Sequence, residues 1–223
     1  MLHSTYFHKE TNEDPKTSSV FENLMLLPDN VFWYILKLSC FNNNDLPTNS
    51  GRLLSYNFWP HWDGKGTSNS VFVEPDLYIK FEEFDVIIEA KYGDTAGQGE
   101  GQWKNEIIAY HNEYGDSKNL VFIAVGGNMN LLEETVKVKK ELVKIHKCNW
   151  LSILMSVNKY LKEIEYVSVP DMTNSATKRL LDNIILAFNI NGVYNIDWFD
   201  TMARKTPAIN AQSIDNLQTL YRW

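Results

Sequence analysis

Residues 73–91, VEPDLYIKFEEFDVIIEAK, decide how this chain is expected to fold. Two short apolar runs are joined by Glu82 and Glu83, a pattern that is typical of a β-hairpin with a tight charged turn. One acid, Asp76, lies inside the first run, and an acid and a lysine close the second. Charged groups on strands that should fill a core are costly, so these positions need a specific reason.

Alternation along the strands places the charges on one face of the expected hairpin. Glu89 and Lys91 share a face, because side chains two residues apart on a strand point the same way. The opposite face is apolar and can pack against a helix: Val86, Ile88 and Ala90. When the two arms pair around the turn, Asp76 comes close to Glu89 and Lys91. Crowded carboxylates raise one another's pKa, and a divalent cation relieves the crowding.

Carboxylate oxygens are ligands that Mg²⁺ prefers, so the residues predict a Mg²⁺ site at Asp76 and Glu89, with Mn²⁺ as a substitute. A metal at such a site polarises phosphoryl oxygens and lowers the pKa of a bound water that attacks a phosphodiester. Lys91 is expected to orient or deprotonate that water and to stabilise the developing charge. The alternative is that these groups form solvated salt bridges, which contribute little energy.

The stretches EPD at 74–76 and EAK at 89–91 resemble the motif of the PD-(D/E)XK nuclease superfamily. The resemblance implies a restriction-endonuclease-like core in the order helix, β-meander, helix and strand. It also implies that an acid on the first core helix joins the metal site, and Glu22 is the candidate. A solvated helix-surface glutamate is the alternative for that residue.

Members similar to the RecB-like group carry a glutamine on the helix after the lysine, usually as Q-x-x-x-Y. Gln102 is the candidate for this position in GQWKNEIIAY. The chain departs from the pattern, because Glu106 stands four residues further on and Tyr110 stands eight further on. The departure leaves the subgroup open, and Gln102 could instead be a solvent-facing residue in the first turn of the helix.

The expected fold class is α/β, a restriction-endonuclease-like central mixed β-sheet flanked by helices. We expect one domain over residues 1–223, with a core at about 17–125 and residues 126–223 as a helical elaboration packed on it. The expected elements are a helix over 17–38 that starts at TSSVFE and breaks near Pro28, a strand in 52–60, hairpin arms at 71–81 and 84–91, a helix over 102–114, a buried strand at 120–125, and helices at 131–147, 151–162 and 175–190.

Composition limits the partners and the location of the protein. The chain has 223 residues and a net charge of −7. An acidic protein binds nucleic acid poorly in general, so a polyanion site must be local or be completed by a metal or a partner. We find no run of about 18 apolar residues that would cross a membrane and no apolar signal core. Cys40 and Cys148 form no metal or redox motif, so we expect two reduced thiols in a cytoplasmic protein.

Two further features have both a functional and a structural interpretation. Four lysines are spaced for one face of the expected 131–147 helix: Lys137, Lys140, Lys144 and Lys147. They could follow a phosphate backbone, or they could form the solvated side of an amphipathic helix. Trp59 and Trp62 are candidates for base stacking, although tryptophans are more often part of a core.

The leading hypothesis is a Mg²⁺-dependent deoxyribonuclease of the PD-(D/E)XK type. Asp76 and Glu89 hold the metal, Lys91 serves the attacking water, and Glu22 and Gln102 assist. The resemblance favours DNA as the substrate and a prokaryotic defence system or mobile element as the setting. The acidic net charge with only a small basic face indicates action as a homodimer or as a subunit of a larger complex. One alternative is an inactive nuclease-like fold that acts as a binding or assembly subunit. Another is a nuclease of RNA or structured DNA.

Overall fold

A computed structural model describes residues 13–69, 71–95, 97–139, 141–166 and 172–194. The helices are α2 (Glu13–Leu24), α3 (Asp29–Ser39), α4 (Glu100–Tyr114), α5 (Trp150–Tyr166) and α6 (Met172–Ile190). The strands are β1 (Leu53–Phe58), β2 (Trp62–Asp63), β3 (Phe72–Val73), β4 (Leu77–Phe81), β5 (Asp85–Ala90), β6 (Leu120–Val125), β7 (Glu134–Val138) and β8 (Glu141–Cys148). The polar first dozen residues and the C-terminal segment, for which the sequence gives only weak signals, lie outside the described residues.

Six strands form one mixed sheet in the order β1-β4-β5-β6-β8-β7. β1, β4 and β5 pair antiparallel as a meander. β6 runs parallel to both β5 and β8, and β7 pairs antiparallel with β8 at the edge. β2 and β3 form a separate two-stranded ribbon. The expected α/β class with a mixed sheet flanked by helices is therefore confirmed.

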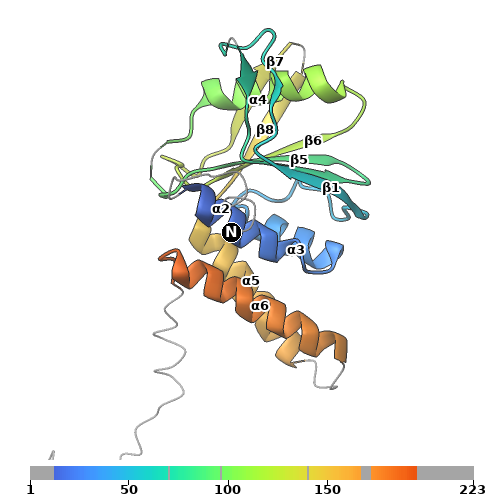
Figure 1. The fold of residues 1–223 in the computed structure, drawn as a ribbon, viewed down its shortest axis with the longest axis vertical. Coiled ribbons are helices and arrows are strands. Elements are labelled where there is room, and N and C mark those ends of the chain that lie inside the picture. The colour runs from blue at the N-terminus through green and yellow to red at the C-terminus, as the bar shows by residue number, and fades with distance from the viewer. Residues whose placement is uncertain (1–12, 70, 96, 140, 167–171, 195–223) are drawn as a thin grey trace, which may run out of the picture.

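The helices cover the two faces of the sheet unequally (Figure 1). α4 lies alone on one face, while α2, α3, α5 and α6 lie on the other. Alternation along β5 divides its side chains between two cores, as expected. Ile87 packs in the cluster under α4, and three residues pack in the larger cluster with the four helices: Val86, Ile88 and Ala90.

The tight turn of the hairpin is confirmed, but its first arm is shorter than expected. The amide of Phe81 donates to the carbonyl of Phe84 at 3.0 Å, which closes the chain around Glu82 and Glu83. The expected arm over 71–81 is interrupted, because β3 pairs with β2 and only β4 pairs with β5. The break falls at Glu74–Pro75–Asp76, where proline has no N–H to donate to a ladder.

The strand expected at 120–125 is confirmed as β6, whose residues are buried except for a half-buried Leu120. The chain then turns at Gly126, which has φ +66°, a left-handed conformation that favours glycine. A Cβ at Gly126 would lie 2.7 Å from the carbonyl oxygens of both Lys91 and Gly93. The absence of a side chain at this position therefore lets the segment after β5 lie directly against the end of β6.

The helix expected over residues 131–147 is wrong, because this segment is the β7–β8 hairpin. Its apolar residues also fit period two, with Val136 and Val138 buried and Lys137 exposed between them. The lysines therefore do not form a helical stripe. Lys144 pairs with Glu133 at 2.6 Å and Lys147 with Glu134 at 2.7 Å. The region after residue 125 adds two strands to the sheet as well as helices α5 and α6.

Three smaller expectations have clear outcomes. The first helix starts at Glu13 rather than at TSSVFE, and Thr17 is buried inside it. Cys40 and Cys148 are free, buried thiols, as expected. No described helix is both long enough and apolar enough to cross a membrane.

Candidate active site

Asp76 lies at the entrance to β4, directly across the hairpin from Glu89. The pairing of Leu77 with Ile88 sets this register, since the next residues outward are Asp76 and Glu89. Asp76 is 7% exposed, and its Oδ2 accepts a hydrogen bond from the amide of Ala90 at 2.7 Å. Burial, followed by the charge of Glu89, raises the pKa of Asp76 well above its ordinary value.

Glu89 is the centre of the cluster. Glu89 is 1% exposed. Its Oε1 accepts hydrogen bonds from the Nζ of Lys91 and, at 2.5 Å, from the Nε2 of Gln102. Burial raises the pKa of Glu89, while Lys91 acts in the opposite direction. The structure thus brings together four of the predicted residues: Asp76, Glu89, Lys91 and Gln102.

Lys91 is held between two carboxylates. Its ammonium group contacts Glu89 and also lies 3.6 Å from Oε1 of Glu13, at the start of α2. Burial by itself lowers the pKa of Lys91, but Glu89, then Asp76 and Glu13, raise it by more. The pKa of Lys91 therefore lies above its usual value, and the side chain keeps its proton near neutral pH.

Glu106 is a site residue that the sequence analysis did not predict, because it was considered only as the residue in the place of the tyrosine of Q-x-x-x-Y. It lies one turn after Gln102 on α4, is 1% exposed, and shares a hydrogen bond with the carboxyl group of Glu89. Burial, followed by the charge of Glu89, raises its pKa well above the ordinary value, which favours a protonated Glu106. Its Oε2 is buried and has no hydrogen-bond partner.

The start of α2 fixes the chain just after Lys91. Oε2 of Glu13 accepts a hydrogen bond from the amide of Tyr92 at 2.9 Å. The Nζ of Lys16 donates to the carbonyl of Tyr92 at 2.9 Å and lies 4.6 Å from the ring of Trp150. Burial lowers the pKa of Lys16 to about 8. Helix α2 therefore holds the backbone directly after Lys91 through both the amide and the carbonyl of Tyr92.

Glu22, the acid that the resemblance assigned to the metal site, lies nine residues beyond Glu13 on α2. At a rise of about 1.5 Å per residue, the two positions are about 13.5 Å apart along the helix axis. The α2 acid that contacts Lys91 is Glu13. A role for Glu22 in the site stays a prediction.

Tyr110, which stands eight residues after Gln102, hydrogen-bonds to Asp85 rather than to the carboxylate cluster. Its hydroxyl donates to Oδ2 of Asp85 at 2.9 Å, and the hydroxyl of Tyr78 donates to the same oxygen at 2.8 Å. Lys118 pairs with the other oxygen of Asp85 at 2.8 Å. This fully bonded carboxylate lies at the first residue of β5, while Glu89 lies near its end. We therefore assign it a structural role.

The donor set of the cluster suits a hard divalent cation. Asp76, Glu89 and Glu106 offer only oxygen atoms, and one of these, Oε2 of Glu106, is buried without a partner. In the part of the chain that the structure describes, no three His, Cys, Asp or Glu side chains are already arranged to hold a metal. Hydrogen bonds from Lys91 and Gln102 instead engage Glu89. A bound cation would have to compete with these hydrogen bonds.

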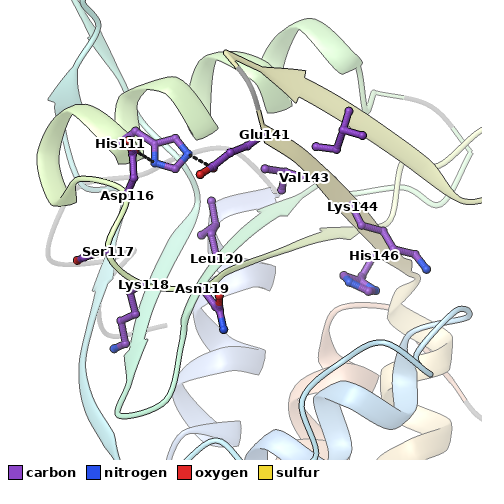
Figure 2. Close-up of a pocket in the computed structure, with 11 residues that line it drawn as sticks. His111, Asp116, Ser117, Lys118, Asn119, Leu120, Glu141, Val143, Lys144 and His146 are labelled. Carbon is purple, nitrogen blue, oxygen red and sulfur yellow. Dashed lines mark ion pairs between the residues drawn. The ribbon is translucent and has the colours of Figure 1, made fainter.

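A polar cavity of about 360 Å³ lies at the end of the sheet opposite the carboxylate cluster (Figure 2). There His111 lies between Asp116, 2.7 Å from Nδ1, and Glu141, 3.5 Å from Nε2. The cavity is lined by Leu120 at the start of β6 and by Glu141 at the start of β8. Ligands of open α/β sheets bind beyond the carboxyl ends of the strands. The end of β5, with Glu89, is therefore the better candidate.

Trp59 and Trp62, the candidates for base stacking, are 6% and 3% exposed and belong to the two hydrophobic cores. Their rings are not available as stacking platforms in this structure. The alternative interpretation, that they are core residues, is the one that the structure supports.

Comparisons with known proteins leave the family open. No protein-family model matches the chain. The chain is 34% identical over 136 residues to a protein of Pasteurella multocida (strain Pm70) that is described only as uncharacterized. The match covers 60% of this chain and 50% of the relative, so the chain spans about half of that protein's length.

Proposed function

We propose that the protein is a metal-dependent hydrolase that cleaves phosphodiester bonds, with DNA as its substrate. The observation that carries the proposal is the cluster at the end of β5. Three buried carboxyl groups, Asp76, Glu89 and Glu106, lie with Lys91 at one point of the sheet.

The cluster is difficult to explain by stability alone. A buried acid loses solvation, and apolar residues of similar volume often stabilise a fold as well or better. Asp85 shows how this chain neutralises a buried acid when its role is structural, with two tyrosine hydroxyls and a lysine around it. Glu106 lacks such neutralisation, since one oxygen has no partner and its pKa is raised. Residues with perturbed pKa values cluster at functional sites.

The order of elements supports the finer fold assignment that we propose, the restriction-endonuclease-like fold. Helices α2 and α3 precede the β1-β4-β5 meander, and α4 and the parallel strand β6 follow. The EPD stretch directly precedes β4, and the EAK stretch closes β5, with Lys91 as the first residue after that strand. The fold and the motif together support membership of the PD-(D/E)XK superfamily.

Asp76, Glu89 and Glu106 would hold the metal, and Mg²⁺ or Mn²⁺ suits their oxygen atoms. When bound, such an ion polarises the phosphoryl group and lowers the pKa of a bound water. Release of the proton from Glu106 frees its carboxylate to act as a ligand. Gln102 orients the carboxylate of Glu89 through its hydrogen bond to Oε1.

We assign Lys91 a charge-stabilising role rather than the role of a base. Its neighbours raise its pKa above the ordinary value, so it remains an ammonium group at neutral pH. A fixed positive charge beside the reacting phosphoryl group stabilises the negative charge that develops in the transition state. Glu13 holds this ammonium group in place from α2.

One observation favours the second candidate, an inactive nuclease-like subunit that binds or assembles. Lys91 and Gln102 already occupy Oε1 of Glu89, so this oxygen has its partners without a metal. In that case the cluster would act as a closed polar network in the core. The homodimer, the defence or mobile-element setting and the cytoplasmic location stay predictions.

Plasmid cleavage tests the proposal. Supercoiled DNA is incubated with the protein in Mg²⁺, Mn²⁺ or EDTA, with Asp76→Asn, Lys91→Met and the control Glu83→Gln. Glu83 lies exposed at the turn of the same hairpin. We expect metal-dependent nicking that falls at least about 100-fold in the first two variants and is retained in the control. Cleavage of RNA but not DNA would support the RNA alternative. Absence of metal-dependent cleavage of either would support the binding subunit.

A further inference from the structure

A cationic hollow lies beside α4, outside the carboxylate cluster. It has a volume of about 530 Å³, and its floor and walls include Ile108 and Asn112. Four lysines line it, with one glutamate, Glu100. The lysines come from three parts of the chain: Lys65 after β2, Lys104 on α4, and Lys137 and Lys139 on β7 and its turn. The lining thus carries a net charge of +3 in a protein whose net charge is −7.

The four lysines of the hollow lack acidic partners, unlike several other lysines of the described residues. Elsewhere Lys118, Lys144, Lys147 and Lys178 each form an ion pair with an aspartate or glutamate. No ion pair joins the hollow's lysines to an acid within the ranges that the structure describes, and all four are exposed. Like charges placed together without counter-charges repel one another, and a bound anion relieves that repulsion.

Hydrogen bonds and packing hold together the backbone that carries the lysines of the hollow. Asn112 donates to the carbonyls of Asp63 and Lys65 at 3.0 and 2.8 Å, and Asn105 donates to Oγ of Ser68 at 2.7 Å. These bonds dock the loop that carries Lys65 onto α4. On the other side, β7 lies against α4 (Figure 1). A preformed arrangement of charges loses less entropy on binding.

Helix α4 connects the hollow to the candidate active site. Gln102 and Glu106 face the carboxylate of Glu89, while Lys104 and Ile108 line the hollow. Residues two apart on a helix point to different sides, so one helix presents its inner side to the reacting group and its outer side to the lysines. A polymer of phosphates that reached Glu89 across the first turns of α4 would pass the hollow.

We propose that this hollow binds the phosphate backbone of the nucleic-acid substrate on one flank of the cleavage site. The inference rests on the proposed function, because the hollow and the carboxylate cluster lie on two sides of the same helix, α4, and a phosphodiester polymer is long enough to contact both. The cavity around His111 is less suited to this role, since its two lysines are balanced by Asp116 and Glu141. Backbone contacts of this kind position a substrate without reading its sequence.

The salt dependence of binding tests the inference. Anisotropy of a labelled DNA duplex of about 30 base pairs is measured in EDTA over a range of KCl concentrations, where each phosphate contact contributes about 0.9 to the slope of log K against log [salt]. The double variant Lys104→Gln/Lys137→Gln is expected to reduce the slope by about 1.8. The control Lys159→Gln/Lys178→Gln removes the same charge from α5 and α6 and is expected to leave the slope unchanged.

The outcomes separate this inference from the proposed function. An unchanged slope in the first variant overturns the inference, and so does a failure to bind both the DNA duplex and a matched RNA duplex, even if plasmid cleavage is observed. A reduced slope without any metal-dependent cleavage supports the hollow and overturns the nuclease. A reduced slope for only one of the two duplexes supports the hollow and identifies the polymer. Loss of binding to anionic lipid vesicles without a change for either duplex overturns the inference in favour of a membrane surface.

Discussion

Replacement of Glu106 by glutamine tests whether the buried cluster retains protons. In the metal-free protein, burial and the charge of Glu89 raise the pKa of Glu106 well above its ordinary value of 4.5. The folded state therefore binds more protons than the unfolded state as the pH rises above 4.5, and stability falls with pH in this window. Glutamine has a similar shape, and its amide donates to Glu89 without taking up a proton. The Glu106→Gln variant should therefore lose less stability as the pH increases.

The magnitude follows from linkage. Each extra proton in the folded state changes the free energy of unfolding by about 1.4 kcal/mol per pH unit. Removal of one retained proton flattens the wild-type curve by at most that amount, which is about 2.7 kcal/mol over the two pH units between pH 5 and pH 7. Asp76, whose pKa is also raised, remains in the variant, so part of the pH dependence should persist. A change of this size is large against a typical total stability of about 5–15 kcal/mol.

Urea unfolding in EDTA at several pH values between 5 and 7.5 measures the effect. Glu83→Gln serves as the control, because Glu83 is exposed at the hairpin turn and its replacement removes the same charge. We expect the Glu106→Gln curve to be flatter than that of the wild type and the control curve to be parallel to it. Parallel curves for the wild type and Glu106→Gln would refute the claim that Glu106 is protonated in the folded protein.

Three other substitutions test how the fold supports the site. Phe122→Ala should lower the free energy of unfolding by about 3–5 kcal/mol in chemical denaturation, since Phe122 is fully buried under α4. Tyr110→Phe removes one donor from buried Asp85 and should cost about 1.5–3 kcal/mol in the same assay, and no loss would contradict the structural role of this network. Gly126→Ala should cost at least about 1–2 kcal/mol and reduce cleavage, because its φ is +66° and a Cβ would contact the carbonyl of Lys91 at 2.7 Å. Gly99→Ala, where a Cβ would meet nothing within 4 Å, is the matched control and should keep both stability and activity.

The sequence predicts those parts of the fold that short-range patterns determine. Residues 120–125 form an unbroken apolar run, and such a run is typical of a strand covered on both faces. The turn at Glu82 and Glu83 follows from the two apolar arms around it. The alternation in 86–90 also predicts which face of β5 meets the helices.

The β7–β8 hairpin could not be recognised in the same way, because its turn lacks the usual residues. Turns of this kind favour Asn or Gly at positions with positive φ. Here Lys139 takes that place with φ +52°. The apolar and basic residues around it fit both a helical period and a strand period, and the absence of a turn signal favoured the helix. The paired register of Val138 with Glu141 shows the strand arrangement.

The candidate site was predictable where a motif carries it and not where the tertiary fold assembles it. Asp76, Glu89 and Lys91 lie on one hairpin, so alternation and pairing bring them together. Glu13 reaches Lys91 only because α2 begins earlier than the apolar pattern indicates. Glu106 follows Gln102 by one helical turn, and that spacing could have signalled a second carboxyl group beside Glu89.

The central claim is that the three buried carboxyl groups bind a metal and that they retain at least one proton until it binds. Calorimetric titration with Mn²⁺ tests this claim most directly. Titrations at pH 7 in two buffers of different ionisation enthalpy give both the binding stoichiometry and the number of protons released. We predict one bound ion and the release of about one proton or more, with both effects lost in Asp76→Asn. An absence of binding, or binding without proton release that persists in Asp76→Asn, would contradict the account.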